Sequence, residues 1–163
     1  MNDPAHAYTP PRDAGRQLPL ALQQYLDGSD LLRKTQALRL STVDAAGWPH
    51  AMLLSAGEML AVPPQRLRFA LFAQSTTATN LARDGRVVLT LALDGGLCEV
   101  RLQVRRLQPD DGPLALYEGT VVEVRHHAAP YADVSNGINF QLHQPEAVQP
   151  RWQRQLAALK SAH

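Results

Sequence analysis

Hydroxyl and amide side chains crowd one short stretch of the chain, and they comprise Ser75, Thr76, Thr77, Thr79 and Asn80. The pattern around them predicts a polar helix over residues 76–83, so these groups stand at a helix start. Free backbone N–H groups and the helix dipole favour an anion there. The stretch is therefore a candidate site for a phosphate-bearing ligand. The alternative interpretation is an ordinary N-cap and first helical turn without a ligand.

Other reactive side chains give weaker patterns. His126, His127 and His143 suggest a metal site, but adjacent histidines point to different faces, and no Cys or carboxylate stands at a ligand spacing. We therefore predict no metal. Ser41 and Ser55 lack the Gly-x-Ser-x-Gly pattern of a nucleophile elbow, which disfavours hydrolysis.

Composition narrows the class of protein. A chain of 163 residues forms one domain with a real core, and a formal charge of +1 argues against nucleic acid as a partner. Cys98 is the single cysteine and lies in an apolar run, which predicts a core position and a reducing compartment. No apolar run approaches the roughly 20 residues of a membrane span, and no secretory signal is evident. We expect a cytoplasmic protein without a membrane partner.

Short strands with alternating apolar and polar side chains surround the predicted helix. They are expected at residues 37–43 and 49–55, 59–62 and 67–72, and 86–93 and 98–105, with turns at 44–47, Pro63-Pro64 and Asp94-Gly95-Gly96. These patterns predict a mainly β fold, with consecutive antiparallel strands and short flanking helices.

The ends of the chain carry the remaining predicted elements. Residues 1–17 are rich in Pro, Ala and charge and predict a flexible N-terminal arm, which leaves residues 18–163 as a single domain. Short helices are expected at 18–26 and 31–34. A last strand at 137–142 precedes a C-terminal helix that begins at Pro145 or Pro150, with Trp152, Leu156 and Leu159 on one face.

The segment 114–127 is ambiguous. Pro113, after Asp110-Asp111-Gly112, suits a helix start, whereas Val121, Val122 and Val124 prefer a strand. We favour a helix here.

The order of these elements resembles the flavin-binding split barrels related to pyridoxamine 5′-phosphate oxidase. LSTVDAAGWPHAMLL resembles the first hairpin of that family, and STTATNLARDGRVVLTL resembles its phosphate-binding turn, helix and following strand. The resemblance covers residues 31–107 and, more weakly, 137–159. It implies a six-stranded antiparallel split β-barrel and a homodimer that binds FMN in clefts at the subunit interface.

The resemblance also implies site residues. Ser75, Thr76, Thr77 and Asn80 correspond to the residues that hold the phosphate. His50, Met52 and Leu53 lie where the second strand passes the flavin, and Ala70 and Leu71 where the backbone of the fourth strand does. His50 is equally well explained as a surface histidine.

The chain departs from the family where positive charge is usual. Thr76 and Thr77 stand where Arg or Lys is frequent, and Met52 stands where an Arg often reaches the phosphate. Charge-assisted hydrogen bonds contribute roughly 1.5–3 kcal/mol each, so their loss weakens phosphate binding. Candidates to replace the charge are Arg83, Arg86, Arg101 and Arg105.

Three functions follow as hypotheses. The first is an FMN-dependent oxidoreductase that acts on an unidentified small molecule, in which the cofactor performs the redox step and few catalytic side chains are needed. The second is a non-catalytic split-barrel binding protein that has lost FMN. The third is a split barrel that binds another planar ligand such as haem.

Overall fold

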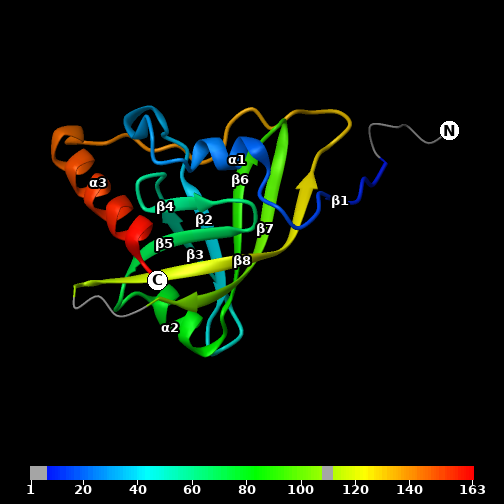
Figure 1. Ribbon diagram of the computed structural model, residues 1–163. Coiled ribbons are helices and arrows are strands. Elements are labelled where there is room, and N and C mark those ends of the chain that lie inside the picture. The colour runs from blue at the N-terminus through cyan, green and yellow to red at the C-terminus, as the bar shows by residue number, and fades with distance from the viewer. Residues whose placement is uncertain (1–6, 108–111) are drawn as a thin grey trace.

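Antiparallel strands dominate the computed structural model, which describes residues 7–107 and 112–163. The strands are β1 (Arg12–Asp13), β2 (Leu38–Val43), β3 (Pro49–Leu54), β4 (Met59–Val62), β5 (Arg66–Phe72), β6 (Arg86–Leu93), β7 (Gly96–Arg106) and β8 (Leu114–His127). The helices are α1 (Leu20–Tyr25), the 3-10 helix η2 (Leu31–Arg33), α2 (Thr76–Arg83) and α3 (Pro145–Ser161). All strands belong to one sheet of order β3-β2-β6-β7-β8-β5-β4, and β1 pairs with β8 (Figure 1).

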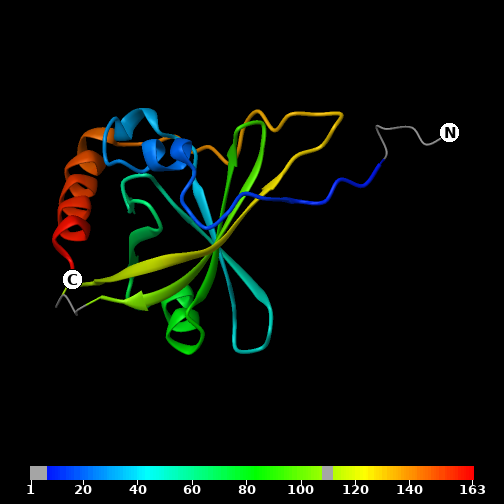
Figure 2. The ribbon, with the colours of Figure 1, turned by 45° about the vertical axis from the view of Figure 1, so that its right-hand side comes forward.

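The sheet curls because its longest strand serves both halves. The N-terminal part of β8 pairs with β5, from Leu114 to Thr120, whereas its C-terminal part pairs with β7 as far as His127. The β7–β8 register shifts between Arg101 and Leu102, an irregularity that increases local twist. The result is the curled half-barrel seen in Figure 2, with α2 below the sheet and α3 beside it. This confirms the predicted mainly β, split-barrel fold, although the described residues form a sheet of eight strands and not six.

Alternation along the strands builds the core. Leu38 and Leu40 of β2, Leu89 of β6 and Val100 of β7 are at most 1% exposed. Cys98 lies among them, as predicted. Burial, helped by the nearby charges of Asp94 and Glu99, raises the pKa of its thiol to about 11.

The helix favoured for residues 114–127 is wrong, because this segment forms β8. Pro113 precedes the strand and does not open a helix. The segment forms a strand because β5 and β7 each need a neighbouring strand to satisfy their backbone groups, and β8 supplies the ladder hydrogen bonds for both. Val121 and Val124 face the core, which suits β-branched side chains.

The strand expected at 137–142 is also wrong. The segment makes one isolated bridge, between Asn139 and Gln36, and two flanking backbone hydrogen bonds, so its crossing is limited to residues 35–37, just before β2. The crossing is close: a Cβ at Gly137 would lie 2.3 Å from the side-chain oxygen of Gln36.

The two ends of the described chain are tied to the sheet. Within the expected arm at residues 1–17, Arg12 and Asp13 pair with β8, and residues 1–6 lie outside the described residues. The C-terminal helix α3 begins at Pro145, the first of the two predicted starts, and buries Trp152, Leu156 and Leu159 as predicted. No helix within the described residues is both long and apolar enough to cross a membrane.

Candidate functional site

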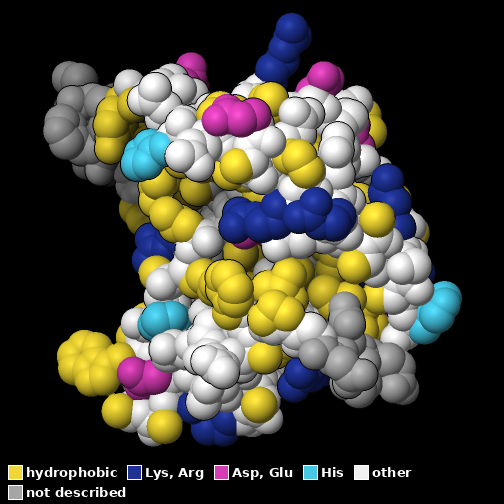
Figure 3. Space-filling model, turned by 90° about the vertical axis from the view of Figure 1, so that its left-hand side faces the viewer, with side chains coloured by type: hydrophobic (Ala, Val, Ile, Leu, Met, Phe, Trp, Pro, Cys, Tyr) yellow, Lys and Arg dark blue, Asp and Glu magenta, His cyan; other side chains and the backbone are white. Residues whose placement is uncertain are grey.

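A cavity of about 450 Å³ lies between the strands β3 and β5 and the helix α3. Its lining comprises Met52, Leu53 and Leu54 of β3, Glu58, Ala70, Leu71 and Phe72 of β5, Pro113 and Leu114, and Arg151, Arg154, Gln155 and Ala158 of α3. Figure 3 shows the face that carries α3, where basic side chains adjoin a hydrophobic patch. The cavity is thus apolar on the strand side and polar on the helix side.

Helix α3 is fixed over the strands by Trp152. This side chain is 2% exposed and packs edge-on against Phe140, with 6.3 Å between the ring centroids. It also packs on the turn before β4 at Gly57, where a Cβ would lie 2.1 Å from the Trp152 ring. Because the turn residue is glycine, the helix approaches closely enough to form the second wall of the cavity.

A buried ion pair holds the far end of α3. Arg68 donates from Nη1 to the Leu159 carbonyl at 2.9 Å and from Nε to Oε2 of Glu118 at 2.8 Å. Arg105 donates to the other Glu118 oxygen at 2.8 Å. Burial alone would raise the pKa of Glu118, but the hydrogen bonds from Arg68 and Arg105 and the charges of Arg66 and Arg105 lower it below its ordinary value. Glu118 is therefore ionised at neutral pH and orients Arg68 toward the helix.

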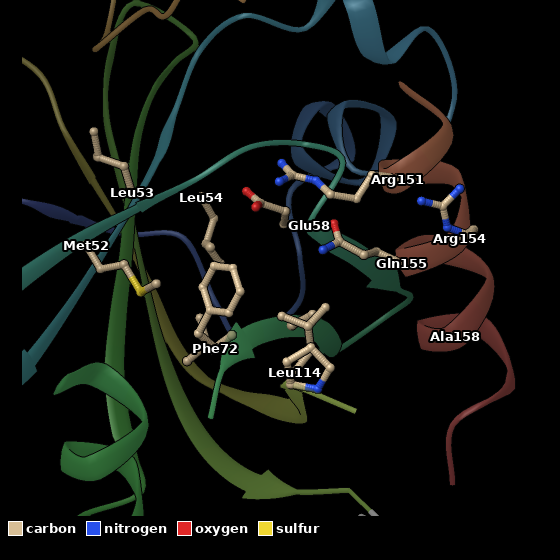
Figure 4. A pocket seen from close by; sticks show the side chains of 13 residues that line it. Met52, Leu53, Leu54, Glu58, Phe72, Leu114, Arg151, Arg154, Gln155 and Ala158 are labelled. Atoms are coloured by element: carbon tan, nitrogen blue, oxygen red, sulfur yellow. The ribbon is translucent and has the colours of Figure 1, made fainter. Parts of the chain in front are cut away.

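The polar side of the cavity is formed by four residues. Glu58 accepts at Oε2 from the backbone N–H of Ser55 at 2.8 Å and from the Ser55 hydroxyl at 3.0 Å. The Arg151 side chain extends from α3 toward Glu58 (Figure 4). Arg154 follows one helical turn later, and Gln155 lies beside it with its Oε1 atom buried and without a hydrogen-bond donor among the described residues.

A second hollow of about 300 Å³ continues from the first. It shares Leu53, Leu54, Glu58 and Arg151 with the larger cavity and extends along Ile138, Phe140, Leu142 and Trp152. Arg151 and Glu58 therefore stand where two apolar compartments meet.

The structure separates the site residues that the sequence predicts into two groups. Met52, Leu53, Ala70 and Leu71 all line the cavity. His50 lies further along β3, opposite Thr42 of β2, and does not line it.

The second group stands at the start of α2. Ser75 is the N-cap, and its Oγ accepts from the backbone N–H of Ala78 at 3.1 Å. Asn80 is 2% exposed and donates to Oγ1 of Thr42 at 2.9 Å. Thr77 is 1% exposed, and its hydroxyl has no partner among the described residues. Of this predicted group, Thr76 is exposed and faces solvent at the first helical position.

The four arginines considered as sources of the missing charge are all engaged elsewhere. Arg83 donates to the Val43 carbonyl, and Arg86 pairs with Asp84 at 2.6 Å. Arg101 pairs with Glu99 at 2.9 Å, and Arg105 pairs with Glu118 at 2.8 Å. The start of α2 therefore offers hydroxyl and backbone N–H groups without help from these guanidinium groups.

Sequence reasoning missed all four polar lining residues, Glu58, Arg151, Arg154 and Gln155, and five apolar ones, Leu54, Phe72, Pro113, Leu114 and Ala158. One signal was present, because Arg151, Arg154 and Gln155 have the i, i+3, i+4 spacing of one helix face. The spacing does not show which strands that face covers. That depends on the contact of Trp152 with Gly57, which lies far away in sequence.

His126 and His127 each contact another group of the protein. His127 lies 2.9 Å from Oε2 of Glu99, and His126 lies 3.0 Å from the Leu93 carbonyl. Across residues 7–107 and 112–163, no group of three or more His, Cys, Asp or Glu side chains is placed to hold a metal ion.

Comparison with known proteins finds a protein that is similar in sequence and solved structures that are similar in fold. No protein-family model matches the chain. The uncharacterized protein YclD of Bacillus subtilis (strain 168) is 38% identical over 145 residues, which cover 85% of this chain and 93% of YclD.

Two solved structures share the fold at low sequence identity. A candidate pyridoxamine 5′-phosphate oxidase from Lactobacillus delbrueckii superimposes with a TM-score of 0.53 at 21% identity, covering 68% of this chain and 95% of that one. HupZ from Group A Streptococcus superimposes with a TM-score of 0.52 at 13% identity, covering 72% of this chain and 100% of that one.

Proposed function

We propose that this chain, which belongs to the split-barrel family related to pyridoxamine 5′-phosphate oxidase, binds FMN and supports the oxidation or reduction of a small molecule. The observation that carries the proposal is an agreement between the family resemblance of the sequence and the lining of the cavity in the structure. The family resemblance implies five positions for the flavin ring, and four of them, Met52, Leu53, Ala70 and Leu71, line one cavity, whereas His50 does not.

The cavity suits a flat ring with polar edges. Its volume of about 450 Å³ lies within the roughly 300–1,000 Å³ of small-molecule sites. Leu54, Leu71 and Phe72 offer apolar surface that would exclude water from one side of the ring. Glu58 and Gln155 would accept hydrogen bonds from its N–H groups. When bound, the flavin itself would supply the redox chemistry.

The phosphate end of FMN would lie at the start of α2. The first backbone N–H groups of a helix have no partner inside the helix and point outward, which favours an anion. Ser75, Thr76, Thr77 and Asn80 stand there, and the Thr77 hydroxyl lacks a partner among the described residues. Because this cradle is neutral, we expect weaker FMN binding than in relatives that have Arg or Lys there.

The proposed assembly is a cytoplasmic homodimer. Leu53 and Phe72 line the cavity yet are 49% and 61% exposed, as expected if a partner subunit covers them. The buried single cysteine suits a reducing compartment. Sedimentation equilibrium tests the assembly, and a mass of one 17.9 kDa chain would contradict it.

The test of the proposed function compares FMN with riboflavin, which lacks the phosphate. Flavin fluorescence is titrated with the wild-type protein, Thr76→Glu and Thr79→Glu. Both threonines are exposed on α2, but Thr79 faces a separate hollow beside Arg106. We expect Thr76→Glu to weaken FMN binding at least tenfold by repulsion of the phosphate, which is about 1.4 kcal/mol, while riboflavin binding stays the same.

Thr79→Glu is the matched control, because it adds the same charge to the same helix and should leave FMN affinity within a few-fold of wild type. Equal loss of FMN affinity in both variants would show that the phosphate of FMN does not bind at the helix start. An absence of saturable flavin binding to the wild-type protein would overturn the proposal altogether.

A flavin-free binding protein is the second candidate function. The observation that favours it is the neutral helix start, since Thr76 and Thr77 replace basic residues and Arg83, Arg86, Arg101 and Arg105 bind elsewhere. Haem has less support, because none of the described residues that line the cavity is a histidine. The visible absorption spectrum and the same titration distinguish these functions.

A further inference from the structure

Helix α3 brings two guanidinium groups to the polar side of the cavity. Arg151 and Arg154 both line it, and neither has an ion-pair partner within residues 7–107 and 112–163. By contrast, the sheet arginines Arg68, Arg101 and Arg105 each contact a carboxylate. Among the described residues that line the cavity, Glu58 is the single carboxylate beside these two cations, so the pair is a potential binding site for an anion.

We propose that Arg151 and Arg154 form an oxyanion subsite, so that the small molecule entering this cavity carries a carboxylate or phosphate on an apolar body. Guanidinium groups bind both oxyanions through paired N–H donors. The apolar body would contact Leu54, Leu71 and Phe72. The inference deepens the proposed function by naming a substrate class, and it rests on that function for the role of substrate.

The second hollow gives the apolar body room to extend. Arg151 lines both compartments, and the second one continues past Phe140 and Leu142. A ligand anchored at Arg151 by its anion can therefore place hydrophobic surface on either side of the anchor. Burial of apolar surface near the charge also lowers the local dielectric constant and strengthens the ion pair.

One polar group beside the arginines favours a ligand over plain solvation. The Oε1 atom of Gln155 is buried without a donor among the described residues, so a donor on the ligand would satisfy it. Glu58 lines the same side, and its Oε2 atom is held by Ser55. Its negative charge opposes an anion at Arg151, so Glu58→Gln should strengthen anion binding while keeping an acceptor for Ser55.

The test uses a matched set of probes on the full chain without added flavin. Calorimetric titrations compare 2-naphthoate, 2-naphthyl phosphate and the neutral 2-naphthalenemethanol, which share one apolar body. We expect both anions to bind more tightly than the alcohol. The Arg151→Gln/Arg154→Gln variant should lose at least tenfold in anion affinity, about 1.4 kcal/mol, with no change for the alcohol. The preferred anion identifies carboxylate or phosphate as the source of the oxyanion.

The control is Arg33→Gln/Lys160→Gln, which removes the same charge. Neither residue lines the cavity, and Lys160 lies on the exposed side of α3. Equal anion affinity in the wild type and in the Arg151/Arg154 variant, equal loss in the control, or no binding of either anion at millimolar concentration would overturn the subsite.

A flavin titration of the same variants separates this inference from the proposed function. If the Arg151/Arg154 variant loses affinity for FMN but not for riboflavin, the arginines hold the cofactor phosphate and the substrate assignment is wrong. If the wild type binds naphthoate through the arginines but binds no flavin, the oxyanion subsite is confirmed and the proposed function is wrong.

Discussion

At the scale of single residues, the decisive features are polar atoms without partners. Thr77 at the start of α2 and Gln155 on α3 each bury an oxygen that no described residue satisfies. An unsatisfied buried polar atom costs about 1–3 kcal/mol, so such atoms are uncommon without a ligand or water. Their positions, one near the proposed phosphate and one in the cavity, agree with the two ends of the proposed site.

Cys98 gives a prediction at this scale. Because burial raises the pKa of its thiol to about 11, almost no thiolate forms at neutral pH. We expect Ellman's reagent to leave the native protein unlabelled over a time in which a free thiol reacts completely. Unfolding in guanidinium chloride should then release one reactive thiol per chain. Rapid stoichiometric labelling of the native protein would contradict the burial of Cys98.

Several residues of the site could be predicted from sequence, and others could not. Met52, Leu53, Ala70 and Leu71 were named because they lie on strands whose order resembles a known family, and they line the cavity, while their contact with a flavin stays a prediction. Arg151 and Arg154 were missed because their role depends on where α3 docks. Arg83 and Arg105, two of the candidates for the missing charge, are each held by an acceptor elsewhere, Val43 of β2 for Arg83 and Glu118 of the neighbouring strand β8 for Arg105.

At the scale of elements, the strand and helix bounds that could be predicted are those marked by turn or capping residues. The bounds of β4, β6 and α2 agree with the expected ranges 59–62, 86–93 and 76–83, because Pro63-Pro64, Ser75 and Asp94-Gly95 mark the ends. Local signals at Pro113 suggested a helix, yet β5 and β7 both required a neighbour, and the segment became β8. Tertiary pairing overrode local preference there.

The attachment of α3 through Glu118 gives a prediction of pH dependence. The hydrogen bonds from Arg68 and Arg105 lower the pKa of Glu118 in the folded protein relative to the unfolded chain. Its stabilisation is therefore complete above the unfolded pKa of about 4.3 and is lost as the pH falls through the lower folded value. At neutral pH, Glu118→Gln should lower the free energy of unfolding by about 1–3 kcal/mol.

Urea unfolding of the wild type and Glu118→Gln from pH 7 down to about pH 3.5 measures this contribution. The difference between the two proteins should shrink as the pH falls. A difference that stays constant across this range would show that the charge of Glu118 does not stabilise the fold.

At the scale of the whole molecule, the curled sheet and α3 together create the cavity. Neither alone would suffice, because the strands supply the apolar wall and the helix supplies Arg151, Arg154 and Gln155. The helix is attached at both ends, through Trp152 against Gly57 and through Arg68 to the Leu159 carbonyl. This arrangement places a charged helix over a position that the family fold implies for a flavin ring.

The most direct test of the central claim blocks the cavity from α3. Ala158 lines the cavity, whereas Ala157 is exposed on the same helix, so Ala158→Trp and Ala157→Trp form a matched pair. FMN binding is measured by calorimetry for the wild type and both variants. We predict saturable micromolar binding to the wild type and to Ala157→Trp, and at least a tenfold loss in Ala158→Trp, about 1.4 kcal/mol. Equal FMN affinity in all three proteins would place the flavin outside this cavity and contradict the account.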